Sequence, residues 1–253
     1  EDGAFKSLCS SKKARKTISE VVSIITGIDY NLIYKAKFIG GELPKQNIKE
    51  KRKASDLIID VKEDLKIIIE MNQFPSKNIF KKNSDYAFNI LTRNTRKNGK
   101  YIKVIIINID NFNYFKTTLP IVDVDIQSKK YIIENNSYKS YHIILENIVN
   151  KEYNKNVNKK VINFFEFLTT KNLEEIKEKY KGDEEYMKMT EKVEDIYNDD
   201  NYIGYYYVED RHKMELEDMR LTGIDEGMAI GKKYGEKNGE KRSEERRVGK
   251  ECR

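Results

Sequence analysis

The sequence predicts an α/β fold built on a mixed sheet. The expected order is helix, strand, strand, strand, helix, strand, followed by extra strands and a C-terminal helical region. Three observations lead to this prediction. Apolar side chains recur at helical spacing near the start, two β-rich runs flank a short polar segment at 62–65, and residues 101–109 are almost wholly apolar.

The first half of the chain supplies the core elements. Apolar residues at i, i+3, i+4 and i+7 make Arg15–Thr26 an amphipathic helix, and Gly27 stands at its C-cap position. Residues 31–39 are rich in Tyr, Ile and Phe and predict the first strand. The β-rich runs at 56–61 and 66–72 predict a hairpin.

Further elements follow the hairpin. Helical spacing at 78–97 predicts the next helix, and the apolar run at 101–109 predicts a central strand. Residues 121–126, 131–134 and 141–148 predict strands that extend the sheet. The C-terminal helices are expected at Lys159–Thr169, 173–180, Glu184–Tyr197 and 209–234.

Composition divides the chain into three segments. A sheet domain is expected over 1–150 and an acidic helical region over 151–240, where glycine recurs every fourth residue from Gly223 to Gly239. The tail at 241–253 has no apolar periodicity and resembles translated adaptor sequence, so we exclude it from the fold. Because the chain starts without Met, we expect its N-terminus to be incomplete.

Charge is distributed unevenly along the chain. The net charge is +6, yet residues 1–120 carry 23 Lys and Arg against 13 Asp and Glu, whereas residues 161–240 carry 12 against 21. A basic front half is suited to a polyanion such as nucleic acid. The alternative is a solvated surface that binds no partner.

Cysteine and histidine are too few for several kinds of site. Cys9 and Cys252 lie too far apart in sequence for a CxxC metal site and do not form a disulfide framework, which favours a reducing cytoplasm. With only His142 and His212 besides, a zinc site is not expected, and any metal chemistry must rest on carboxylates and hard cations. No apolar run reaches the roughly 18 residues of a membrane span.

Two carboxylates are expected to meet at the open end of the hairpin. A turn at 63–64 places Asp56 opposite Met71, and therefore next to Glu70. Period-two alternation directs the Asp56 and Glu70 side chains to the same face. Asp60 would lie opposite Ile67, nearer the turn, and is the weaker ligand candidate.

Buried together, these carboxylates would repel one another. A cation that neutralises them removes this cost, so Asp56 and Glu70 indicate a metal site, with Asn72 beside it. The alternative is that both acids lie at exposed strand ends and pair with Lys53 or Arg52.

The order and spacing of these motifs resemble a known family, the PD-(D/E)XK nuclease family of transposases, of the recombination-promoting nuclease (Rpn) type. The resemblance covers nearly all of residues 1–240. It implies a restriction-endonuclease-like αβββαβ core and a Mg²⁺-dependent (or Mn²⁺-dependent) DNA endonuclease. The motifs that carry it are Phe5-Lys6, the first helix, Lys53-Ala54-Ser55-Asp56-Leu57, Ile68-Ile69-Glu70-Met71-Asn72, Ile107-Asn108-Ile109-Asp110-Asn111-Phe112 and the glycine repeat.

The resemblance also implies residue roles. Asp56 and Glu70 would hold the metal, the backbone carbonyl of Met71 is a third ligand, and Glu20 on the first helix would assist or simply face solvent. Asn72 takes the place of the motif lysine and is expected to orient a water without supplying positive charge.

Two further features bear on activity. Lys81 or Lys82 is expected to replace the missing motif lysine, unless both simply lie on a solvated helix face. Ile106 occupies the position where relatives often have glutamine, so one polar contact is expected to be missing. Contacts to DNA phosphates are expected from Lys51, Arg52, Lys53, Lys81, Lys82, Arg93, Arg96 and Lys97.

Two other functions remain open at this point. Besides the endonuclease, these are a catalytically degenerate nuclease fold that only binds DNA, and an interaction scaffold that self-associates through the helices at 171–237. His142, next to an apolar strand, is expected to be a packed core residue and not a general base.

Overall fold

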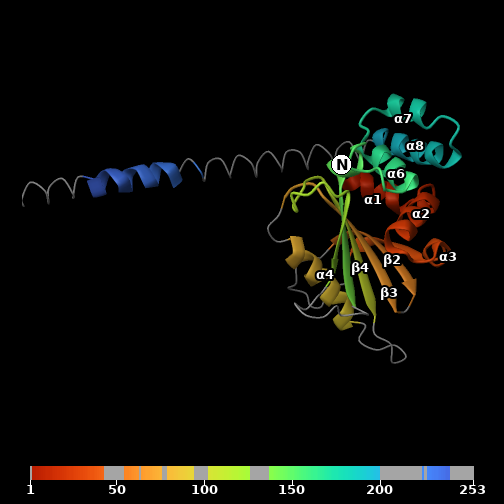
Figure 1. The fold of residues 1–253 in the computed structure, drawn as a ribbon, viewed down its shortest axis with the longest axis horizontal. Coiled ribbons are helices and arrows are strands. Elements are labelled where there is room, and N and C mark those ends of the chain that lie inside the picture. Colours follow the sequence, from red (N-terminus) through yellow and green to blue (C-terminus); the bar gives the residue numbers. More distant parts are fainter. Residues whose placement is uncertain are drawn as a thin grey trace, which may run out of the picture. The chain divides into compact units, whose positions relative to one another are not determined.

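The computed structural model describes residues 2–42, 54–62, 64–75, 79–93, 102–125, 137–199, 224 and 227–239. The chain divides into two compact units, Glu1–Ile196 and Tyr197–Arg253. The first unit holds the sheet and the helices that cover it (Figure 1).

A six-stranded mixed sheet forms the centre of the described part of the first unit, in the order β1-β2-β3-β4-β6-β5. Strands β1 to β3 form an antiparallel meander, and β4 pairs in parallel with both β3 and β6. This confirms the prediction that the apolar run at 101–109 is a central strand. The strands are β1 (Lys37–Glu42), β2 (Ala54–Lys62), β3 (Leu65–Asn72), β4 (Lys103–Asp110), β5 (Ile121–Asp125) and β6 (Tyr138–Ile144).

The helices complete the predicted core order, because α2 precedes the meander and α4 connects β3 to β4. Gly27 ends α2 in the left-handed conformation, at a φ of 73°, as the C-cap prediction requires. The helices are α1 (Asp2–Ser10), α2 (Arg15–Thr26), α3 (Tyr30–Tyr34), α4 (Ile79–Arg93), α5 (Leu145–Ile148), α6 (Lys159–Thr169), α7 (Leu173–Lys179) and α8 (Glu184–Tyr197).

The strand predicted at 31–39 is wrong in its first half, which forms α3. The Asp29 side chain accepts the backbone N–H of Leu32 at 3.2 Å and caps this helix. Arg15 then donates from Nε to the Tyr34 carbonyl at 3.0 Å, so local hydrogen bonds outweigh a weak alternation. The strand begins only at Lys37.

The strand predicted at 141–148 is displaced. Strand β6 starts at Tyr138 and ends at Ile144, and residues 145–148 form the short helix α5. The Asn147 amide holds this turn by donating to the carbonyls of Thr117 and Leu119, at 2.8 and 3.0 Å. The strand predicted at 131–134 lies outside the described residues, as do residues 94–97 of the helix predicted at 78–97.

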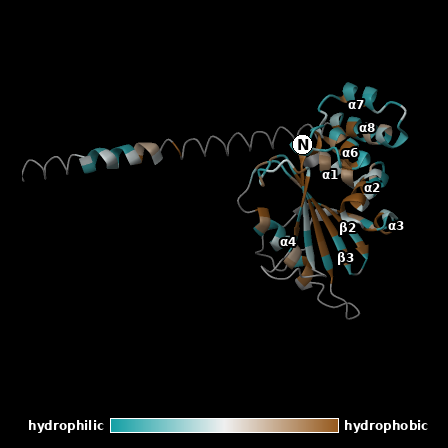
Figure 2. Ribbon diagram, viewed as in Figure 1, coloured by the Kyte–Doolittle hydropathy of each residue, from teal (hydrophilic) through white to brown (hydrophobic). Residues whose placement is uncertain are grey.

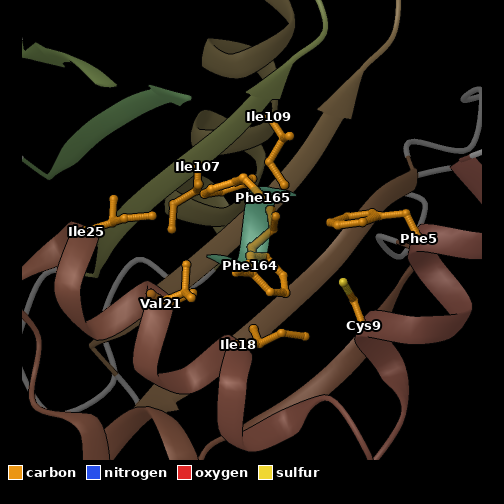
Figure 3. Close-up of a pocket in the computed structure, with 11 residues that line it drawn as sticks. Phe5, Cys9, Ile18, Val21, Ile25, Ile107, Ile109, Phe164 and Phe165 are labelled. Atoms are coloured by element: carbon orange, nitrogen blue, oxygen red, sulfur yellow. The ribbon is translucent and has the colours of Figure 1, made fainter. Parts of the chain in front are cut away.

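Helices α1, α2 and α6 cover one face of the sheet, and α4 covers the other (Figure 1). The first face closes over an apolar cavity of about 20 Å³ (Figure 3). The thiol of Cys9 lies at this cavity, fully buried, and burial raises its pKa. The cavity is lined by Phe5, Cys9, Ile18, Val21, Val22, Ile25, Ile69, Ile107, Ile109, Phe164 and Phe165.

Under α4, a second apolar cluster fills the start of the parallel strands. Tyr86, Ala87 and Ile90 pack from the helix against Ile68 and Ile106 of the sheet. Hydrophobic residues, interrupted by hydrophilic ones, make up much of the strands, whereas α7 is largely hydrophilic (Figure 2).

Helices α6 and α7, and all of α8 except Tyr197, belong to the first unit. Phe164 and Phe165 of α6 are buried against the same cavity as α2, and hydrophobic burial of this kind holds a single core together. Charge acts in the same direction, since Lys13 and Lys16 pair with Glu191 and Glu185 of α8, each at 3.2 Å.

Most of the described part of the second unit is a helix at 227–239 whose side chains are all exposed. It runs beyond residue 234, where the sequence predicted its end, and includes the last four glycines of the repeat. Among the residues that the structure describes, none of the helices combines the length and apolar character of a membrane span. The tail at 241–253 lies outside the described residues.

Candidate active site

The hairpin of β2 and β3 brings the two predicted carboxylates together. Leu57 pairs with Ile69, so the register continues to Asp56 beside Glu70. This is one residue away from the predicted pairing, because an irregularity between Asp60 and Lys62 places one extra residue of β2 against β3 and shifts the register beyond it. Asp60 consequently faces Lys66 and forms an ion pair with it at 2.7 Å, away from Glu70.

Asp56 is held at both of its carboxylate oxygens. Only 5% of the residue is exposed, and its Oδ2 accepts the backbone N–H of Met71 at 2.6 Å. Its Oδ1 forms an ion pair with Lys6 of α1 at 3.1 Å. Sequence analysis assigned Lys6 no role beyond its place in a motif, because no local pattern connects α1 with the hairpin.

Glu70 is the most unusual carboxylate of the described residues. It is 2% exposed; its Oε2 pairs with Lys82 of α4 at 2.8 Å, and its Oε1 is buried without a hydrogen-bond partner among the residues described. Burial raises the pKa of Glu70 to about 7; Lys82 acts to lower this pKa and nearby Asp56 to raise it.

Lys82 places its ammonium next to Asn72, the residue that stands in place of the motif lysine. Its Nζ donates to Asn72 Oδ1 at 3.3 Å and lies over the ring of Tyr86, 5.6 Å from the ring centre. The side chain of Lys81, on the next position of α4, is exposed. Of the two lysines considered from the sequence, Lys82 is the one that contacts the carboxylates.

The polar contacts continue from β3 into β4 and β6. The Asn72 amide nitrogen donates to Asn108 Oδ1 at 3.2 Å and to Asp110 Oδ1 at 2.8 Å. Asp110 Oδ2 in turn lies 2.7 Å from His142 Nδ1, and His142 is fully buried, as the sequence predicted. Ile106 is buried in the apolar cluster, so the polar side chain that β4 supplies here is Asn108.

The donors at this site fit a hard divalent cation. Asp56, Glu70 and the Met71 backbone all offer oxygen, which Mg²⁺ and Mn²⁺ prefer. Among the described residues, Oε1 of Glu70 is a buried acceptor without a donor, as expected of a cation ligand. Within the described parts of the chain, no group of three or more His, Cys, Asp or Glu side chains is arranged to hold a metal.

Comparison with known proteins identifies the family. The model of the PD-(D/E)XK nuclease family transposase matches residues 1–221. The chain belongs to this family. Neither the curated proteins nor the solved structures compared with the chain include a match.

The PD-(D/E)XK assignment agrees with the architecture. Helix α2, strands β1 to β3, helix α4 and strand β4 follow one another in the αβββαβ order of the restriction-endonuclease-like fold. The site lies where β2 and β3 present Asp56 and Glu70, the acids that the family resemblance singled out.

Other residues proposed for the PD-(D/E)XK site are placed elsewhere or lie outside the described residues. Glu20 of α2 pairs with Lys160 of α6 at 3.0 Å, and no contact connects it with Asp56 or Glu70 among the described residues. Helix α4 ends at Arg93, whose side chain is outside the described part. Also outside it are Lys51, Arg52, Lys53, Arg96 and Lys97.

Proposed function

We propose that this PD-(D/E)XK protein is a DNA endonuclease of the recombination-promoting type that depends on Mg²⁺ or Mn²⁺. One observation carries the proposal: Glu70 is buried beside Asp56 with one carboxylate oxygen lacking a partner among the described residues. A protein gains nothing structural from such an arrangement, which raises the pKa of Glu70 to about 7. A bound cation would satisfy the free oxygen and favour the ionised form.

Each residue of the candidate site has its own proposed role in phosphodiester hydrolysis. Asp56, Glu70 and the Met71 carbonyl would hold the metal, which supplies Lewis-acid polarisation of the phosphate and a water of lowered pKa. Lys82 stands beside Glu70 and is placed to stabilise negative charge that develops on the phosphate. Asn72 would orient the attacking water, and any help from Glu20 would require release from Lys160.

The substrate would be bound through its phosphates. Lys51, Arg52, Lys53, Arg93, Arg96 and Lys97 are the proposed contacts, together with Lys81 and Lys82. If four to six of them each neutralise a phosphate, log affinity for duplex DNA should fall with log salt at a slope of roughly −4 to −5. A slope near zero would contradict DNA binding by this face.

A plasmid-nicking assay tests the catalytic assignment. Asp56→Asn and Glu70→Gln should each reduce Mg²⁺-dependent nicking by at least about a hundredfold, because each removes a metal ligand. Asp60→Asn is the matched control, since it removes a carboxylate of the same strand that pairs with Lys66 and should retain most activity. Full activity in Asp56→Asn, or equal losses in all three variants, would contradict the site.

A second candidate function is DNA binding without cleavage. It is favoured by the ion pairs that Lys6 and Lys82 make with Asp56 and Glu70, since these neutralise both carboxylates without a metal. Calorimetric titration with Mg²⁺ distinguishes the two functions. Salt-sensitive DNA binding without Mg²⁺ uptake or nicking would support the second.

The proposal also covers the cellular compartment of the protein and its self-association. We place the activity in a reducing cytoplasm, where the free, buried thiol of Cys9 would stay reduced. Self-association through the helical region at 151–240 is a further possibility that sedimentation at several protein concentrations tests, and a monomer at all of them would exclude it.

A further inference from the structure

Polar side chains at the carboxyl ends of three parallel strands form a buried line that ends at the candidate site. His142 Nδ1 on β6 lies 2.7 Å from Asp110 Oδ2 on β4, and Asp110 Oδ1 lies 2.8 Å from the amide nitrogen of Asn72 on β3. His142 and Asp110 are 0% and 1% exposed, and the rings of Phe80 and Phe115 pack against the His142 ring. A buried acid and a buried imidazole are expensive to desolvate, so their pairing calls for a reason.

The donor and acceptor roles along this line are fixed by its members. Asn108 directs its amide nitrogen to the Tyr141 carbonyl at 3.4 Å, and the same nitrogen lies 3.5 Å from His142 Nε2. Nε2 therefore accepts, and Nδ1 carries the proton that is donated to Asp110. Because a carboxylate only accepts, Asp110 binds the amino side of the Asn72 amide and leaves the amide oxygen on the opposite side.

The side-chain oxygen of Asn72, which Asp110 does not contact, accepts a hydrogen bond from Lys82. Lys82 Nζ lies 3.3 Å from Asn72 Oδ1 and 2.8 Å from Glu70 Oε2. If the amide turned over, its amino group would face the ammonium, and two donors would oppose each other. The orientation of one amide thus decides whether Lys82 is held against Glu70.

We propose that Asp110 and His142 are positioning residues that lock the Asn72 amide with its oxygen toward Lys82, and thereby hold the Lys82 ammonium at Glu70. Asp110 sets the amide orientation, and His142 holds the Asp110 carboxylate in place. The consequence for DNA cleavage rests on the proposed function, whereas the placement of Lys82 can be measured without substrate or metal.

NMR of protein labelled with ¹⁵N in its lysine side chains measures this placement in metal-free buffer. The Lys82 ammonium should exchange its protons slowly enough to give a signal, assigned by its absence in Lys82→Arg. In Asp110→Asn, the introduced amino group can face Asn72, the amide turns, and exchange at Lys82 should accelerate about tenfold or more. The Lys66 ammonium, paired with Asp60 at 2.7 Å, should keep its rate as the internal control.

Two more variants make the result decisive. Asn72→Leu removes the amide and leaves Asp110 and His142 in place, so proton exchange at Lys82 should accelerate in this variant as well. If circular dichroism shows that Asp110→Asn does not fold, the exchange rate in Asn72→Leu tests the proposal instead. Asp123→Asn changes an exposed acid on β5 that pairs with Lys139 and should leave Lys82 unaffected. An unchanged Lys82 exchange rate in folded Asp110→Asn or in Asn72→Leu overturns the proposal.

Cleavage kinetics test the positioning role independently of the NMR measurement. Asp110→Asn should lower kcat for plasmid nicking about tenfold with KM unchanged, and it should have no further effect in a Lys82→Ala background, because it acts through Lys82. Additive losses in this double-mutant cycle overturn the positioning role and indicate a merely structural one. Absence of nicking in the unmodified protein counts against the proposed function alone, and the NMR measurement then decides the placement of Lys82.

Discussion

The two faces of β3 and β4 differ at the carboxyl ends of these strands. On the face beneath α1, α2 and α6, both strands carry buried isoleucines: Ile67, Ile69, Ile105, Ile107 and Ile109. On the face beneath α4, each strand carries one buried isoleucine, Ile68 or Ile106, and is polar beyond it. The polar positions there are Glu70, Asn72, Asn108 and Asp110.

The two faces of this sheet therefore serve different purposes, stability on one face and chemistry on the other. The apolar face is stabilised by hydrophobic burial along its whole length, which is what a fold requires. The polar face buries Glu70, Asn108 and Asp110 almost completely, at a cost in desolvation that a core made for stability alone would avoid. We infer that the polar end of the second face is retained for chemistry, and substitutions on the two faces should behave in opposite ways.

The largest effect is expected on the apolar face. Phe165 of α6 is 1% exposed, so Phe165→Ala should lower the free energy of unfolding by about 3–5 kcal/mol, as removal of a buried ring leaves a void. Urea unfolding followed by circular dichroism measures this. Nicking per folded molecule should be retained, because the ring lies on the face opposite Glu70.

The control for this substitution is an exposed ring of the same type. Phe74 is 67% exposed, and Phe74→Ala should change the free energy of unfolding by no more than about 0.5 kcal/mol. If Phe165→Ala costs as little as the control, or abolishes nicking while the protein stays folded, the separation of the two faces is wrong.

The next largest effect is an increase in the free energy of unfolding, and it is expected from a substitution on the polar face. Since the pKa of Glu70 is raised to about 7 from 4.5, the folded state holds a proton that the unfolded state has lost between these values, and stability falls as pH rises through this window. At pH 8 the penalty is on the order of 3 kcal/mol. Glu70→Gln should therefore be more stable than the unmodified protein at pH 8 and no more stable at pH 4.

Urea unfolding at pH 4 and pH 8 in metal-free buffer tests this prediction. Mg²⁺ should narrow the gain at pH 8, because a ligand that binds the ionised folded protein stabilises it. Glu184→Gln is the control: Lys188 lowers the pKa of this exposed carboxyl, so its titration lies below 4.5 and its effect should not change between pH 5 and pH 8. A pH-independent effect of Glu70→Gln would contradict a buried, proton-binding carboxyl.

The sequence was sufficient for the parts of the fold that depend on local pattern. Alternation and apolar runs predicted β2, β3 and β4, and helical spacing predicted α2 and α6 with the bounds that the structure gives. Local hydrogen bonds were the source of error, since an Asp29 cap makes a helix of residues that alternate like a strand. Helix α1 was missed because its short apolar pattern predicts little by itself.

The candidate site was predictable along the hairpin and at Lys82 of α4, and not elsewhere. Asp56 and Glu70 share a local strand pattern, whereas Lys6, Asp110 and His142 reach the site from elements that no sequence spacing connects. A signal for Asp110 was present, because polar residues at alternate positions of an otherwise apolar central strand require partners on the same face. Their identity depends on the register of three strands, which only tertiary structure fixes.

The smallest predicted effect concerns spare volume on the apolar face. The cavity of about 20 Å³ in Figure 3 borders Val21 of α2 and has room for about one methylene. Val21→Ile should therefore raise the free energy of unfolding by up to about 0.8 kcal/mol, since the added group is buried without displacing its neighbours. Val104 is fully buried in the α4 cluster, and Val104→Ile is the control, which overpacking should destabilise by about 1–3 kcal/mol. Thermal unfolding of both variants compares the packing of the two faces directly. A loss of stability in Val21→Ile equal to that of the control would mean that the apolar face is as tightly filled as the face that carries the site.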